Sequence, residues 1–167
     1  HGDHDQVIAA LVTAATKVQV SDAAVTVSDA DATAITAAEL SAIGETTTGT
    51  VTVTNAVDIH GDHDQVIAAL VTAATKVVVS DATVTITDAM TVAEVNPIAA
   101  ATTGVVTGTV RDTKSNLLNL AISDGDQITI EEIPGPGPGP GPGPDPDPSL
   151  ITGNHDQVIT DLNAVSP

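Results

Sequence analysis

Residues 1–30 and 60–89 are two copies of one sequence, and this repeat constrains the fold more than any other feature. The two copies differ at four positions, Gln19/Val78, Ala24/Thr83, Val27/Ile86 and Ser28/Thr87. Weaker likeness joins residues 38–43 to 93–98 and 47–49 to 102–104, and residues 154–159 form a third partial copy. Tandem copies of this kind are typical of repeat proteins, in which each unit needs its neighbours to bury its apolar face.

The second copy begins with the pattern of a short helix. Asp62 is a predicted N-cap, because Gln65 follows it by three residues as in a capping box. The apolar residues after it recur at helical spacing; they are Val66, Ile67, Leu70, Val71 and Ala74. Residues 76–88 then alternate β-branched residues with others, which predicts a strand with a turn at Asp81–Ala82.

The remaining body continues this alternation of helices and strands. We expect a helix over residues 91–101, limited by Pro97 and ended by Gly104. Further elements are a strand over 105–111, a short helix over 115–122 and a strand over 127–133. Strands that alternate with short helices at a fixed period favour parallel pairing.

The predicted fold is therefore α/β: a repeat solenoid with parallel strands and short helices, with two strand–helix rungs of roughly thirty residues in each repeat. The alternative is a pair of tandem all-β sandwich domains. We expect a solenoid body over residues 1–133, made of repeats 1–59 and 60–133. Residues 134–148 alternate Pro with Gly and then Asp, which predicts an extended spacer. Residues 149–167 form a strand–helix tail, which we expect either to dock on this chain or a neighbouring subunit or to begin the next repeat of a longer chain.

Charge and composition exclude several classes of protein. The formal net charge is −18, from 22 acidic and four basic residues. This balance argues against nucleic-acid binding, which needs clustered Lys and Arg, and against anionic membrane surfaces. No apolar run approaches the ~20 residues of a spanning helix, so we expect no membrane insertion. The chain begins with His1 and not Met, and we expect it to be processed or cut from something longer.

The sequence favours a non-enzymatic role. Cys, Phe, Tyr and Trp are absent, so the core is aliphatic and a thiolate nucleophile is excluded. None of the nucleophile-elbow, zinc-protease or phosphate-loop motifs occurs. A copper site at an N-terminal His1 is the remaining enzymatic hypothesis, and the same sequence at His60, where the chain has no free amine, argues against it.

Acidic residues give two metal hypotheses. His60, Asp62, His63 and Asp64 are of the types that bind Zn²⁺ or Cu²⁺, but Asp62 and Asp64 also suit a helix N-terminus, which we favour. The second hypothesis is Ca²⁺ bound by carboxylates at strand ends. The candidates are Asp22, Asp29, Asp31, Asp81, Asp88, Asp124 and Asp126. Solvated turn residues are the simpler interpretation of these acids.

Three phrases of the body resemble repeats of very large secreted bacterial surface proteins of the adhesin type. They are Val20-Ser21-Asp22-Ala23, Val79-Ser80-Asp81-Ala82 and Thr47-Thr48-Gly49-Thr50-Val51-Thr52. The resemblance covers most of residues 1–133, and the Pro-Gly spacer departs from it. It implies an extracellular or cell-surface location. We expect a structural subunit of a fibre, sheath or surface layer that assembles by self-association into a filament or layer. The alternative is a stalk or adhesive module of a giant adhesin.

Overall fold

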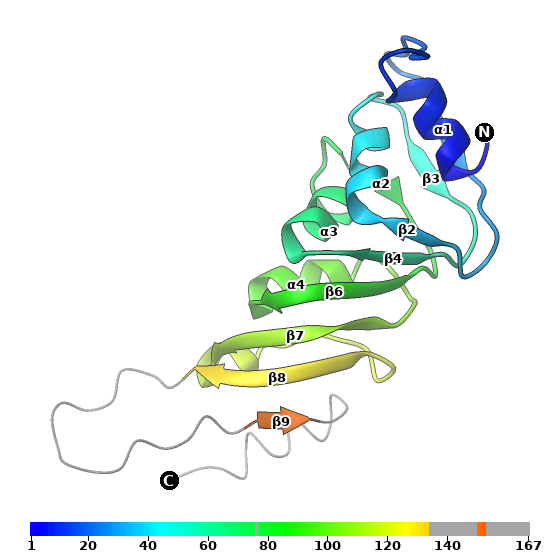
Figure 1. Cartoon of the computed structure of the whole chain (residues 1–167). Coiled ribbons are helices and arrows are strands. Elements are labelled where there is room, and N and C mark those ends of the chain that lie inside the picture. Colours follow the sequence, from blue (N-terminus) through cyan, green and yellow to red (C-terminus); the bar gives the residue numbers. More distant parts are fainter. Residues whose placement is uncertain (76, 134–149, 153–167) are drawn as a thin grey trace, which may run out of the picture.

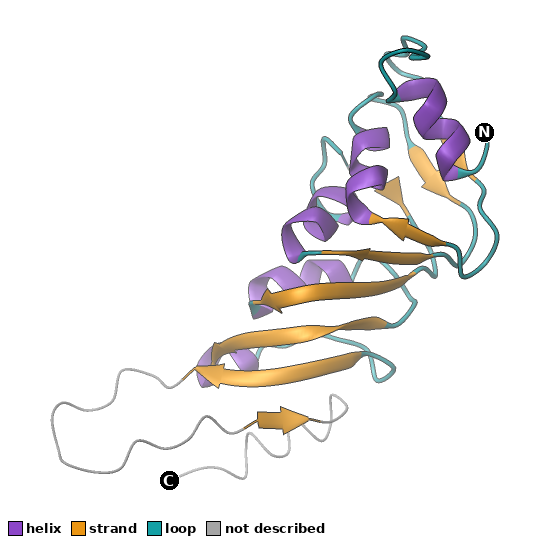
Figure 2. Ribbon diagram, in the orientation of Figure 1, coloured by secondary structure: helices purple, strands orange, loops and turns teal. Residues whose placement is uncertain are grey.

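The computed structural model of the chain describes residues 1–75, 77–133 and 150–152, the last three by backbone alone. Short helices follow one another along one side, and strands follow one another beside them (Figures 1 and 2). The helices are α1 (His4–Leu11), α2 (Ala37–Gly44), α3 (His63–Leu70), α4 (Val92–Ala99) and α5 (Lys114–Leu117). In this part of the chain no helix is long and apolar enough to cross a membrane.

The strands form two sheets. Sheet A has the order β1-β3-β5, and sheet B has the order β2-β4-β6-β7-β8-β9. The strands of sheet A are β1 (Val25–Val27), β3 (Val51–Val53) and β5 (Val77–Val78). Those of sheet B are β2 (Ala34–Thr36), β4 (Asp58–Gly61), β6 (Thr83–Met90), β7 (Val106–Thr113), β8 (Gln127–Ile133) and β9 (Leu150–Thr152).

All neighbouring strands from β1 to β8 pair in parallel. The last pair, β8 with β9, is antiparallel. The prediction of an α/β fold with parallel strands and short helices is therefore confirmed. The alternative of all-β sandwiches is wrong, because helices alternate with strands and the pairing is parallel.

Sheet B divides the body into successive segments, which we call units. Unit 1 is residues 1–33, unit 2 is 34–57, unit 3 is 58–82, unit 4 is 83–105 and unit 5 is 106–126. Ala34 pairs with Asp58, Asp58 with Thr83, and Thr107 with Gln127. The sequence separation between paired residues of neighbouring strands thus falls from 24 or 25 residues to 20. The expected rung of roughly thirty residues is therefore wrong.

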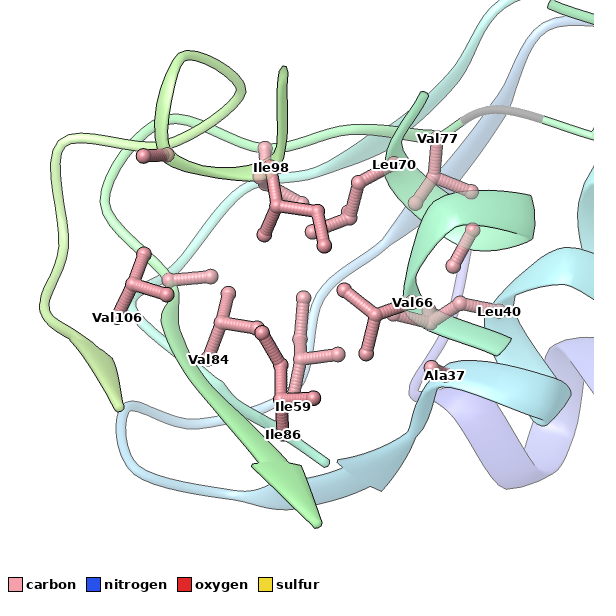
Figure 3. Close-up of a cluster of buried hydrophobic side chains, with 14 of the residues drawn as sticks. Ala37, Leu40, Ile59, Val66, Leu70, Val77, Val84, Ile86, Ile98 and Val106 are labelled. Atoms are coloured by element: carbon pink, nitrogen blue, oxygen red, sulfur yellow. The ribbon is translucent and has the colours of Figure 1, made fainter. Parts of the chain in front are cut away.

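The core lies between sheet and helices (Figure 3). Ile59 and Val84 from the strands point toward Val66 and Leu70 of α3. All four side chains are at most 2% exposed. Because successive residues of a strand face opposite sides, every second residue of the strands enters this layer. The core is aliphatic throughout, as the absence of aromatic residues predicts.

Each predicted element of the second repeat is present, with two differences. The strand predicted over 76–88 is replaced by two strands, β5 and β6, because the chain turns at Ser80–Ala82. The predicted helix over 115–122 is reduced to the four residues of α5. It ends early because Asn96 of α4 accepts a hydrogen bond from the amide of Ala121 and donates one to the carbonyl of Asn119.

The predicted spacer, residues 134–148, and most of the predicted tail, residues 149–167, lie outside the described residues. The tail is described at β9 alone, where Leu150 pairs with Glu131 and Thr152 with Thr129.

Candidate functional site

The N-termini of α1 and α3 have the same local structure, as their sequences predict. Asp3 caps α1 and Asp62 caps α3, each accepting a hydrogen bond of 2.8 Å from the amide of the glutamine three residues later. At α3 the side chain of Gln65 accepts the amide of Asp62 in return and completes the capping box. The prediction that Asp62 begins a helix is confirmed.

A histidine–aspartate pair is added to each of these helix ends. The amide of His4 donates to Asp29 over 2.8 Å, and Nδ1 of its imidazole lies 2.6 Å from the other carboxylate oxygen. His63 makes the same two contacts with Asp88, at 2.8 and 2.6 Å. Each aspartate is 25 residues beyond its histidine. The carboxylate therefore ties the start of α3 to β6, and the start of α1 to the segment that follows β1.

The surroundings of the two pairs differ in exposure and charge. Asp29 is 4% exposed, whereas Asp88 is 42% exposed. Nε2 of His63 lies 3.6 Å from Asp64 and 3.7 Å from Glu94. The hydrogen bond that Asp88 accepts from the ring raises the pKa of His63 above its ordinary value, although burial acts against it. Burial would lower the pKa of His4, but the hydrogen bond and charge of Asp29 outweigh it and raise that pKa.

A third helix is held in a related way. The amide of Val92, the first residue of α4, donates over 3.1 Å to Asp112 in β7. Asp112 also accepts from the amide of Thr113 and from Asn116. Burial would raise the pKa of Asp112, but these donors outweigh it and lower that pKa. A strand carboxylate thus again accepts the first free amide of a helix, where the helix dipole favours negative charge.

A second recurrent contact joins each Thr-Thr-Gly segment to the Ser-Asp-Ala turn of the preceding unit. The hydroxyls of Thr47 and Thr48 donate over 2.8 Å to the carbonyls of Ala23 and Ser21. A Cβ atom added to Gly49 would lie 2.4 Å from the carbonyl oxygen of Ala23. Only glycine therefore allows the two backbones to approach this closely.

The later copy of this contact has the same geometry. Thr102 and Thr103 donate to the carbonyls of Ala82 and Ser80 over 2.6 and 2.9 Å. An added Cβ on Gly104 would lie 2.2 Å from the oxygen of Ala82. The weak sequence similarity of residues 47–49 to residues 102–104 thus corresponds to the same contact, made at two places in the structure.

The structure places the predicted calcium ligands apart from one another. Asp22 and Asp81 lie in exposed turns and accept from the hydroxyls of Ser21 and Ser80. Asp126 accepts the amides of Val106 and Ser123, each over 2.7 Å.

Among the remaining predicted ligands, Asp64 and Asp88 both lie near His63, at 3.6 and 2.6 Å from its ring nitrogens. Asp31 is exposed and accepts from the amide of Ala56, and Asp124 is exposed in the turn before β8. Asp64 is exposed in the first turn of α3, and His60 is half-buried in β4. No group of three or more His, Asp or Glu side chains forms a possible metal cage within the described residues. The metal hypotheses stay predictions.

Sequence reasoning did not predict the histidine–aspartate pairs or the Thr-Thr-Gly contacts. Their signal lies in the repeat itself. His4 and Asp29 recur as His63 and Asp88 at the same separation, although positions around Asp29 changed. Comparison of the chain with protein-family models, with curated proteins and with solved structures finds no match.

Proposed function

We propose that this chain is a structural segment of an extracellular fibre, sheath or surface layer, built by stacking its units into an α/β solenoid. The observation that carries the proposal is the recurrence of the same contacts between successive units. Ser-Asp-Ala turns receive Thr-Thr-Gly segments in units 1 and 2 and again in units 3 and 4. Recurrence of nearest-neighbour contacts is the basis of stability in solenoids.

The parallel register supports stacking along one axis. From β2 to β8 each strand of sheet B pairs with the strand of the following unit. Units 2 to 4 therefore each have a face toward the unit before and a face toward the unit after. Such an arrangement extends in one direction and transmits load through backbone hydrogen bonds, without requiring a substrate pocket.

The surface chemistry supports an extracellular location and a non-catalytic role. A formal charge of −18 and the absence of cysteine suit a solvated surface in salty water, where cations screen repulsion. The histidines that pair with carboxylates do so at helix ends, as capping contacts. The resemblance to bacterial surface proteins adds to this proposal.

Self-association is the second part of the proposal. β8 is the last parallel strand, and its outward edge is paired over three residues by β9. We propose that the tail, residues 149–167, docks in this manner on its own chain or on the next subunit, with the spacer 134–148 allowing the exchange. Head-to-tail exchange of this kind builds an open filament.

Electron microscopy of the purified chain tests the function. Fibres or layers with a regular axial repeat are expected, and a chain that ends at Ile133 serves as the matched control for the tail. Dispersed monomers under all conditions would contradict the proposal and would favour the stalk of a larger adhesin. Normal fibres from the shortened chain would contradict the role of the tail and leave stacking intact.

A further inference from the structure

The outward face of sheet B, which points away from the helices, carries a hollow of about 480 Å³. The hollow lies across β4, β6, β7 and β8, which run side by side in Figure 1. Successive residues of a strand face opposite sides, so the side chains that line the hollow alternate with buried residues such as Val84 and Val106. The polar side chains among them are Asp58, His60, Thr83, Thr85, Thr107 and Gln127.

Four of these side chains form a row across the strands, which we call the polar row. In the parallel register His60 lies beside Thr85, and Thr85 lies beside Thr107. Gln127 of β8 completes the row beside Thr107. Because neighbouring strands are ~4.8 Å apart, the polar row extends about 14 Å in the direction in which the units stack.

The hydrogen-bonding groups of the polar row are available to a ligand. Thr85 and Gln127 are exposed, and His60 and Thr107 are half-buried. Within the part of the chain that the structure describes, no protein group forms a hydrogen bond with any of these four side chains. Hydroxyl, amide and neutral imidazole groups each donate and accept hydrogen bonds. The polar row therefore offers donors and acceptors together to one ligand.

The charge of the hollow favours a neutral ligand. Asp58 is the one acidic residue among the described residues that line it, and its carboxylate accepts a hydrogen bond from the hydroxyl of Thr83. No Lys or Arg is among these lining residues, and the formal charge of −18 repels anions. Phosphate, sulfate and acidic sugars therefore do not suit the site.

The polarity and position of the hollow favour sugars among neutral ligands. An apolar molecule would leave the polar groups of the lining unpaired. An extended peptide would add to the edge of a sheet, whereas the hollow lies on a face. A sugar chain carries hydroxyls along its length, and each of them donates and accepts hydrogen bonds. Val105, which also lines the hollow, supplies an apolar contact for a sugar ring.

We propose that the polar row binds a neutral glycan chain that runs across the strands, along the stacking direction. The sugar hydroxyls form hydrogen bonds in succession with the imidazole, the two threonine hydroxyls and the glutamine amide. These are neutral hydrogen bonds, so we expect a dissociation constant on the order of 1 mM. This binding activity goes beyond the proposed structural role, and it uses none of the side chains that join successive units.

Saturation-transfer difference NMR of the full chain tests the proposal, because it detects weak binding to single chains and to assemblies alike. The probes are cellotetraose, maltotetraose and mannotetraose, and tetragalacturonate is the anionic control. Saturable binding of at least one neutral probe is expected, and no binding of the anionic control. The proposal would be overturned if no neutral probe bound, or if tetragalacturonate bound as tightly as the neutral probes.

The double variant Thr85→Val/Thr107→Val removes two hydroxyls from the polar row and keeps β-branched residues of similar shape in the strands. Its dissociation constant for the bound probe should rise at least about fivefold, because two hydrogen bonds to the glycan are lost. The matched control is Thr26→Val/Thr52→Val, a pair of register partners in sheet A, which should bind as the original chain does. Unchanged affinity in the first variant, or an equal loss in both, would overturn the proposal.

A single exposed substitution keeps the test valid if the double variant does not fold, which circular dichroism reports. Gln127→Ala changes the exposed first residue of β8 and should weaken binding at least about threefold, the effect of one lost hydrogen bond. Unchanged affinity in this variant would overturn the proposal.

Discussion

Nδ1 of His63 lies 2.6 Å from a carboxylate oxygen of Asp88, and Nδ1 of His4 has the same relationship with Asp29. In both pairs the aspartate also accepts the amide of the histidine. One carboxylate thus satisfies a free amide at a helix N-terminus and a ring nitrogen together. Such charge-assisted hydrogen bonds are stronger than neutral ones, so the pairs couple each helix to its neighbouring strand in a pH-dependent way.

We expect stability to fall as the pH rises from about 5.5 to 8. A histidine whose pKa is raised by folding stabilises the folded state below its unfolded pKa, ~6.5, and loses that contribution as the pH rises through the folded pKa. His4 and His63 both have raised pKa values. Their loss should lower the free energy of unfolding by about 1 kcal/mol in total, because both pairs are partly exposed.

Below about pH 4.5 we expect a second decline in stability, because Asp and Glu of the unfolded chain take up protons near pH ~4. Contacts with Thr36 and with Thr91 lower the pKa of Glu39 and of Glu94. Burial would raise the pKa of Asp88, but hydrogen bonds from His63 outweigh it and lower that pKa. These contributions are present above the unfolded pKa and are lost as the pH falls through the folded pKa. Maximum stability should therefore lie between about pH 5 and 6.

Urea unfolding followed by circular dichroism at several pH values measures this profile, since the chain has no aromatic residue to report by fluorescence. The double variant His4→Gln/His63→Gln should lose most of the decline above pH 5.5, and His1→Gln, at the exposed N-terminus, should retain it. A decline of equal size in the double variant would show that other groups cause it.

Gly104→Ala should destabilise the protein by about 1–3 kcal/mol, the usual effect of overpacking. The new Cβ would lie 2.2 Å from the backbone oxygen of Ala82, which has no flexible end to move aside. Gly125→Ala is the control, because nothing lies within 4 Å of a Cβ at that position. It should change stability by less than about 0.5 kcal/mol. Equal stability of the two variants would contradict a close contact between 102–104 and 80–82.

Calcium removal should leave the melting temperature unchanged at constant ionic strength. The candidate ligands Asp22, Asp29, Asp81 and Asp88 each have a protein donor as a partner, and no possible metal cage of three or more ligands forms in the described ranges. Melting in chelator is compared with melting in Ca²⁺ and, as the control for general screening, in Mg²⁺. A rise of several degrees that Ca²⁺ produces and Mg²⁺ does not would revive the calcium hypothesis.

Local sequence predicted the elements better than it predicted their partners. The capping pattern at Asp62 located α3, and Thr91 and Glu94 form the corresponding box at α4. These capping contacts join residues within four positions of each other, so the sequence alone can predict them. The short α5 was not predictable in this way, because it ends where Asn96 of another helix intervenes.

Val18 and Val77 show most clearly what the local sequence does not predict. Their flanking sequences are nearly identical, yet one is exposed and the other lies in a strand. The difference lies in which segment pairs with β3: in the first copy it is Val25–Val27, and in the second it is Val77–Val78. The adjacent residues Gln19 and Val78 are the one local difference, and strand formation at this position also depends on a neighbour.

The central claim is that units add along one axis through nearest-neighbour contacts, and small-angle X-ray scattering of a lengthened chain tests it most directly. A second copy of residues 1–59 inserted after Ile59 repeats the native junction. It should lengthen the particle by about 10 Å, two strand spacings, at an unchanged cross-section. A particle that thickens in all directions, or one that no longer folds, would contradict the claim.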